Sequence, residues 1–89
     1  MPHTLHVHVT ENGYVPAVSV VPRGHPLVAI FTRKVPETCG SDVVFPSLHR
    51  GYDLPLGRPV TVRLTADEVG DSLAFNCSTD LIRGAFVAR

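Results

Sequence analysis

The stretch Ala74–Val87 reads AFNCSTDLIRGAFV and predicts two strands joined by a short polar loop. The first strand ends in Cys77, and the second begins at Arg83-Gly84. A cysteine at the mouth of such a loop is a candidate metal ligand, because its thiolate is a soft donor. The loop itself contains neither histidine nor methionine. The stretch therefore raises the question of whether Cys77 has companion ligands elsewhere in the chain.

Apolar and polar residues alternate at 5–10 and 60–65, other short segments are apolar runs, and no segment shows a helical period over about ten residues or more. Turn-forming residues separate these segments. Seven or eight short strands at such spacing predict an all-β antiparallel sandwich or barrel. The expected strands cover residues 5–10, 14–21, 27–32, 43–45, 60–64, 73–77 and 83–87, with a short extended piece at 52–54.

Local signals refine this pattern. Pro16 lies near the start of the expected strand 14–21 and predicts a sheet edge or a bulge there. Residues 27–32 have so little polar content that we expect them in the middle of the packing. The polar run after Thr65 predicts one helical turn, with Thr65 and Glu68 as its capping pair.

Length and charge limit the classes of function. The 89 residues form one domain, residues 1–89, which we expect to be monomeric. The formal net charge is zero and the arginines are scattered, which argues against nucleic acid or an anionic membrane as a partner. Every apolar run is shorter than the roughly 20 residues that span a bilayer, so membrane insertion is not expected.

The first residues show no signal-peptide pattern. Two compartments therefore stay open: the cytoplasm, or an extracytoplasmic location if the chain is processed or excised from a longer protein. Two cysteines are too few for the disulfide-rich secreted class. They could form one bridge, a pair of thiolate ligands, or two separate thiols.

A series of short motifs occurs in a characteristic order. They are Gly13-Tyr14-Val15-Pro16, Val18-Ser19-Val20, Arg23-Gly24, Val28-Ala29-Ile30-Phe31, Cys39, Val43-Val44-Phe45-Pro46, Leu54-Pro55-Leu56-Gly57, Val69-Gly70, Phe75-Asn76-Cys77 and Arg83-Gly84-Ala85-Phe86-Val87. Together they span nearly the whole chain, and their order resembles that of the cupredoxin family, closest to its small plastocyanin-like copper domains. The resemblance implies a Greek-key β-sandwich of about seven to eight short strands.

The resemblance also implies a ligand set. In the branch that this sequence resembles, a cysteine replaces the upstream histidine of blue-copper proteins, and the final loop pairs its own cysteine with methionines. Such a sulfur set suits Cu(I). Both cysteines are present, as Cys39 and Cys77, and are carried over as the metal ligands. Thr79 and Leu81 stand where the methionines are expected, and Met1 is the single methionine of the chain.

These residues lead to one main hypothesis and two alternatives. The main hypothesis is a copper-binding protein, with Cu(I) held by Cys39 and Cys77. It would act in copper storage, delivery or homeostasis, with a copper transporter or chaperone as partner and no enzymatic activity. The first alternative is a metal-free binding module with a Cys39–Cys77 disulfide, worth on the order of 3 to 4 kcal/mol in the chain-entropy model. The second is an electron-transfer copper protein, which is weaker because the final loop has no histidine.

The histidines provide further candidates. His6 and His8 could hold a metal as an i, i+2 pair, although the alternation favours a simple solvent-facing position. His3 is expected in a frayed terminus and His25 in an exposed turn. His49 follows the strand at 43–45, and its loop could fold over the end of the sandwich where the cysteines meet.

Two remaining patterns carry less weight. Asp80 lies in the final loop, where it could bind a divalent ion, but a turn residue accepting backbone hydrogen bonds is the preferred interpretation. Ser41, Asp42 and His49 are close in sequence, yet no nucleophile elbow accompanies them. Hydrolytic chemistry is therefore not expected.

Overall fold

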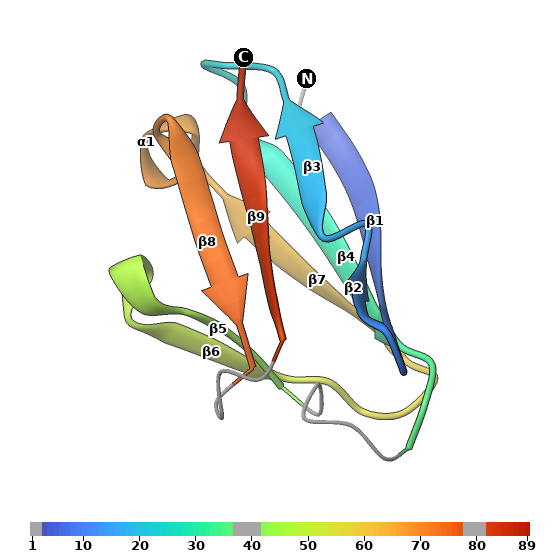
Figure 1. The fold of residues 1–89 in the computed structure, drawn as a ribbon. Helices are drawn as coiled ribbons and strands as arrows, with labels where there is room; N and C mark the ends of the chain where they lie inside the picture. Colours follow the sequence, from blue (N-terminus) through green and yellow to red (C-terminus); the bar gives the residue numbers. More distant parts are fainter. Residues whose placement is uncertain (1–2, 37–41, 78–81) are drawn as a thin grey trace.

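Two β-sheets pack face to face in the computed structural model, which describes residues 3–36, 42–77 and 82–89 (Figure 1). The first sheet has the order β2-β1-β4-β7, formed by β2 (Gly13–Val15), β1 (His3–Thr10), β4 (Leu27–Arg33) and β7 (Pro59–Leu64). The second has the order β3-β9-β8-β5-β6, formed by β3 (Val18–Val21), β9 (Arg83–Ala88), β8 (Ser72–Asn76), β5 (Asp42–Phe45) and β6 (Arg50–Asp53). The predicted all-β sandwich is confirmed.

The number of strands differs from the prediction. Nine strands lie in the described ranges, against the expected seven to eight, because the single strand predicted at 14–21 is two. β2 belongs to the first sheet and β3 to the second, and the chain crosses between them at Pro16 and Ala17. Pro16 has no amide hydrogen for a ladder, which favours an interruption at this point. An almost continuous run of apolar residues, 14–18, passes through the crossing and so hides it.

The sheets are also mixed rather than purely antiparallel. β1 runs parallel to β4, with partners from His3↔Leu27 to Val9↔Arg33, and β3 runs parallel to β9. Between β1 and β4 the chain passes into the second sheet and returns, so it reaches β4 in the direction of β1. Antiparallel pairs join the remaining neighbours in both sheets.

The core lies between the sheets and is built on aromatic rings. All four phenylalanines of the chain are buried there, and Tyr14 joins them at 3% exposure. The rings of Tyr14 and Phe75 meet edge to face at 4.9 Å, and those of Phe31 and Phe75 at 5.3 Å. Such edge-to-face pairs contribute beyond the burial of their area. Phe31 lies on β4, whose predicted position in the middle of the packing is confirmed by its place between β1 and β7.

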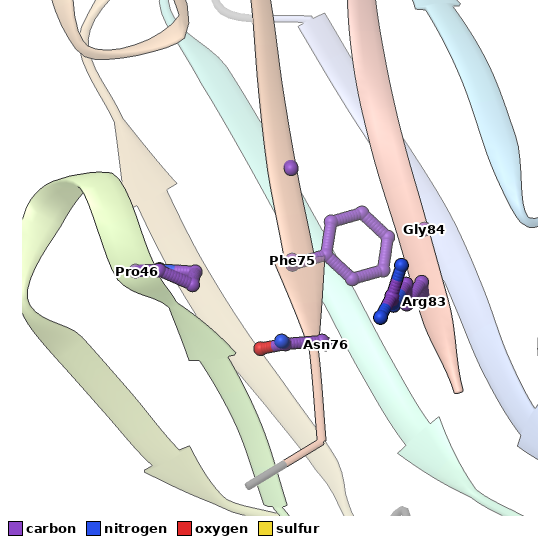
Figure 2. Close-up of a pocket in the computed structure, with 6 residues that line it drawn as sticks. Pro46, Phe75, Asn76, Arg83 and Gly84 are labelled. Atoms are coloured by element: carbon purple, nitrogen blue, oxygen red, sulfur yellow. The ribbon is translucent and has the colours of Figure 1, made fainter. Parts of the chain in front are cut away.

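Gly84 allows the core to close against β9. A Cβ atom at Gly84 would lie 2.5 Å from two ring carbons of Phe75 and 2.7 Å from the carbonyl oxygen of Ala17. Figure 2 shows the Phe75 ring beside Gly84. Farther along β9, Phe86 and Ala88 are buried, so Ala85 and Val87 form the outer, partly exposed face of the strand.

One helical turn, α1 (Ala66–Val69), follows β7 and carries the predicted capping box. The Glu68 amide donates to Thr65 Oγ1 at 3.2 Å, and the Thr65 amide donates to Glu68 Oε1 at 2.8 Å. The other carboxylate oxygen of Glu68 pairs with Arg50 at the start of β6. This pair ties α1 to the hairpin of β5 and β6, whose connection is the 3-10 helix η2 (Pro46–Leu48).

Both chain ends lie at the same end of the sandwich (Figure 1). The expectation of a frayed His3 is wrong, because its amide donates to the Pro26 carbonyl at 2.9 Å and the residue begins β1. At the same end the Arg23 guanidinium pairs with Asp71 at 2.6 Å. None of the helices in the described ranges has the length and apolar character to cross a bilayer.

Candidate metal centre

Three strands meet at the end of the sandwich opposite the termini (Figure 1). β8 ends at Asn76, directly before Cys77, and β9 begins at Arg83. β5 is antiparallel to β8 with Val44 opposite Asn76, so the first residue of β5, Asp42, lies toward the end of β8. We refer to this region as the cysteine end.

Cys77 is completely buried, at 0% exposure. Leu73 and Phe75, which precede it on the same face of β8, are each 1% exposed, so this face of the strand points into the core. The Cys77 amide donates to the Ile82 carbonyl at 3.2 Å, which closes the base of the connection between β8 and β9. Ile82 packs close to Gly13, where a Cβ atom would lie 3.4 Å from its Cγ2. The thiol thus belongs to the apolar interior rather than to the surface.

Tyr14 links the two sheets at the start of β5. Its hydroxyl donates to the Asp42 carbonyl at 3.4 Å, while its ring packs against Phe75. No sequence pattern predicts a role for Tyr14 at the site, and its one local signal is an aromatic residue directly after a turn glycine. The contact fixes the start of β5 relative to β2 and β8.

The second predicted ligand, Cys39, lies outside the described residues, as do Ser41, Thr79, Asp80 and Leu81. The pairing of Cys39 with Cys77 therefore stays a prediction. Across 3–36, 42–77 and 82–89, no three side chains of the His, Cys, Asp and Glu types lie together as a metal-binding group.

All five histidines are exposed, so none of them lies in the core beside the buried Cys77. His49 follows η2 at the far end of β5, where it is exposed with a φ of 55°, so its loop does not cover the cysteine end. Asp42 and His49 thus lie at opposite ends of β5 and form no acid–base pair. His25 is exposed, as predicted. His6 and His8 are exposed on the outer face of β1, also as predicted.

A cationic side chain, Arg33, ends β4 at the cysteine end. Its Nη1 donates to the Pro36 carbonyl at 3.3 Å. Its Nε is buried and has no hydrogen-bond partner within the part of the chain that the structure describes. A buried guanidinium nitrogen without an acceptor favours an anionic group nearby. Arg33 therefore adds positive charge to this end of the molecule.

A shallow hollow of about 360 Å³ lies on the second sheet, where Asn76 at the end of β8 and Arg83 at the start of β9 line it (Figure 2). Its lining residues are Pro46, Ala74, Phe75, Asn76, Arg83 and Gly84. The lining contains no thiol, imidazole or carboxylate, which are the usual protein ligands of transition metals. The hollow is therefore not a metal site.

Neither a protein-family model nor a curated protein matches this chain. Solved structures do match it. The metal-binding domain of the Cu(I)-exporting P-type ATPase CopA from Streptococcus pneumoniae D39, determined with Cu(I), superposes with a TM-score of 0.83 at 22% identity, over 97% of this chain and 84% of that chain. A copper-binding protein solved by NMR in the apo form gives 0.82 at 28% identity, over 97% and 86%.

A pseudoazurin from a Sinorhizobium species superposes with a TM-score of 0.62 at 16% identity, over 100% of this chain and 75% of that chain. The two sheets, the buried aromatic core and these superpositions agree with one another. The chain therefore has a cupredoxin-like β-sandwich fold.

Proposed function

We propose that this protein binds copper as Cu(I) through the thiolates of Cys39 and Cys77, and that it stores or delivers the metal rather than catalysing a reaction. One observation carries the proposal: Cys77 is fully buried at the end of β8, beside the start of β5. Cys39 precedes Asp42, the first residue of β5, by three positions.

The chemistry of two thiolates fits Cu(I). Soft sulfur ligands favour this ion, and two of them satisfy it in a near-linear arrangement, even where Thr79 and Leu81 supply no thioether. Two thiolates and one Cu(I) leave a net charge of −1, which the guanidinium of Arg33 at the same end would partly offset. The apolar surroundings of Cys77 limit contact with water, which also protects a Cu(I) site.

The structural neighbours support this function. Two of them are described as copper-binding, and one of these belongs to a Cu(I)-exporting ATPase. A copper transporter or chaperone is accordingly the partner that we propose. Electron transfer is less well supported, because a blue-copper centre needs two histidines with its cysteine and residues 78–81 contain none. Added Cu(II) should therefore give no intense blue colour.

A Cu(I) competition titration under reducing conditions tests the proposal. We expect one Cu(I) per chain for the unchanged protein, and no measurable binding after the double change Cys39→Ser and Cys77→Ser. Because a buried serine could disturb packing, Cys77→Ala is made in parallel and circular dichroism checks each variant. His49→Gln is the matched control, since it changes a potential ligand at the far end of β5.

A variant that should bind Cu(I) more tightly gives a second test of the proposal. Thr79→Met restores a thioether to the final loop and should tighten Cu(I) binding, provided that this loop contributes to the site. Undiminished affinity in the folded double-cysteine variant would end the proposal. A native protein with no titratable thiols and no copper uptake would instead support the disulfide-bridged, metal-free module.

A further inference from the structure

We propose that His6 and His8 form a second metal site, open to solvent and selective for a divalent transition ion, on the outer face of β1. The two histidines are exposed, whereas Val7 and Val9 between and beside them are 0% exposed. The alternation of β1 therefore directs both imidazoles to the same side of the first sheet, away from the core.

The spacing of the two rings suits chelation. Residues i and i+2 of a strand lie about 6.6 to 6.8 Å apart along its axis. Two nitrogen donors that each lie about 2.1 Å from one ion have to come within about 4 Å of each other. Both side chains are exposed, so they can change rotamer and lean toward a common ion at little cost.

The strand beneath them is a rigid support. β1 pairs with β4 along seven residues, from His3 to Val9, and with β2 from His8 to Thr10, so β4 holds the strand at both histidines and β2 holds it at His8 as well. A ligand pair on a hydrogen-bonded strand keeps its backbone spacing, which favours binding because less ordering is needed. Figure 1 shows β1 and β4 side by side.

The side chains next to His6 and His8 on the outer face are uncharged. Ile30 of β4 is the register partner of His6, and Thr32 of β4 and Val15 of β2 are the partners of His8. None of these three side chains is positively charged, so none would repel a cation. None has a carboxylate, so none would add a charged ligand. The remaining coordination positions of a bound ion would therefore be filled by water.

The class of ion follows from the donors. Imidazole nitrogen suits Cu(II), Ni(II) and Zn(II), and divalent affinity rises toward Cu(II) along the first-row series. A site of two nitrogens and several waters should bind these ions weakly and exchange them readily. It lies on the outside of the first sheet, whereas Cys77 faces the core from the second, so the two sites can be tested separately.

An NMR titration of the ¹⁵N-labelled protein with Ni(II) tests this site, because the paramagnetic ion broadens nearby amide signals. We expect the signals of residues 5–9 and 30–32 to broaden first. His6→Gln and His8→Gln should each weaken Ni(II) binding by about tenfold or more, equivalent to about 1.4 kcal/mol. His25→Gln and His49→Gln are the matched controls, since each removes one exposed histidine, and both should leave the titration unchanged.

Equal broadening around His25 or His49 would overturn the proposal, as would a titration that neither His6→Gln nor His8→Gln changes. Broadening centred on residues 42, 77 and 82 would also overturn it, because the ion would then occupy the cysteine end. Loss of Cu(I) binding in the cysteine variants has no bearing on this result, so each site can fail without the other.

Discussion

Gly84 is the position of β9 where the packing leaves no room for a side chain. Ring carbons of Phe75 and the Ala17 carbonyl both lie closer to an added Cβ than ordinary contact allows. We expect Gly84→Ala to lower the free energy of unfolding by about 1 to 3 kcal/mol, the usual cost of overpacking a core. Urea denaturation followed by circular dichroism measures this loss.

Gly51 provides the control for that substitution. An added Cβ at Gly51 would meet its nearest atom, Val44 Cγ2, at 3.8 Å, which is ordinary van der Waals contact. Gly51→Ala should therefore leave stability unchanged or raise it by up to about 1 kcal/mol, since alanine restricts the unfolded chain. If Gly84→Ala proved equally harmless, the close approach of Phe75 to β9 would be wrong.

At the candidate site, local features could be predicted from the sequence, but contacts between distant residues could not. The strand that ends at Cys77 followed from the alternation of Leu73, Phe75 and Cys77, which is a local pattern. The contact of Tyr14 with Asp42 joins residues 28 positions apart, and no periodicity reports such a pair. The sequence likewise left the position of His49 open, because the direction of β5 depends on its pairing with β8.

The capping box of α1 is a local element whose stability can be tested directly. Thr65→Ala removes the acceptor of the Glu68 amide, and we expect it to cost about 0.5 to 2 kcal/mol of unfolding free energy. Glu68→Gln keeps an oxygen for the Thr65 amide but loses the charge of the pair with Arg50. Because this pair is partly exposed, its loss should cost only about 0.2 to 1 kcal/mol.

Thermal unfolding of the two variants separates these effects. Thr65→Ala should have the lower melting temperature. The opposite order would mean that the ion pair between α1 and β6, rather than the cap, holds this part of the molecule.

Local elements were predictable and their pairing was not. β4, β7 and α1 follow from alternation, low polarity and capping residues, all of which lie within a few positions of one another. The division between β2 and β3 depends on which sheet each half joins, and alternation is the same in both sheets. The parallel pairs β1–β4 and β3–β9 depend likewise on the path of the whole chain.

The whole molecule should respond to copper through its stability, if the proposed function is correct. A ligand that binds only the folded state stabilises it by about 2.7 kcal/mol at a free concentration of one hundred times its dissociation constant. For a domain of this size, that gain raises the melting temperature by roughly 10 to 20 °C. A thermal scan under reducing conditions, with and without Cu(I), measures the shift.

The double variant Cys39→Ser and Cys77→Ser serves as the reference for this scan. Its melting temperature should not change with Cu(I), because the stabilisation requires the two thiolates. A shift of equal size in this variant would assign the copper effect to some other part of the chain.

The arrangement of the chain ends has a practical consequence for attachment. The start of β1 and the end of β9 lie together, and Cys77 lies at the other end of a molecule 36 Å long (Figure 1). A tether, fluorophore or solid support joined to either terminus would therefore leave the cysteine end unobstructed. An immobilised protein would present the cysteine end outward, so the metal exchange with a docking protein that the proposed function requires could be tested on a surface.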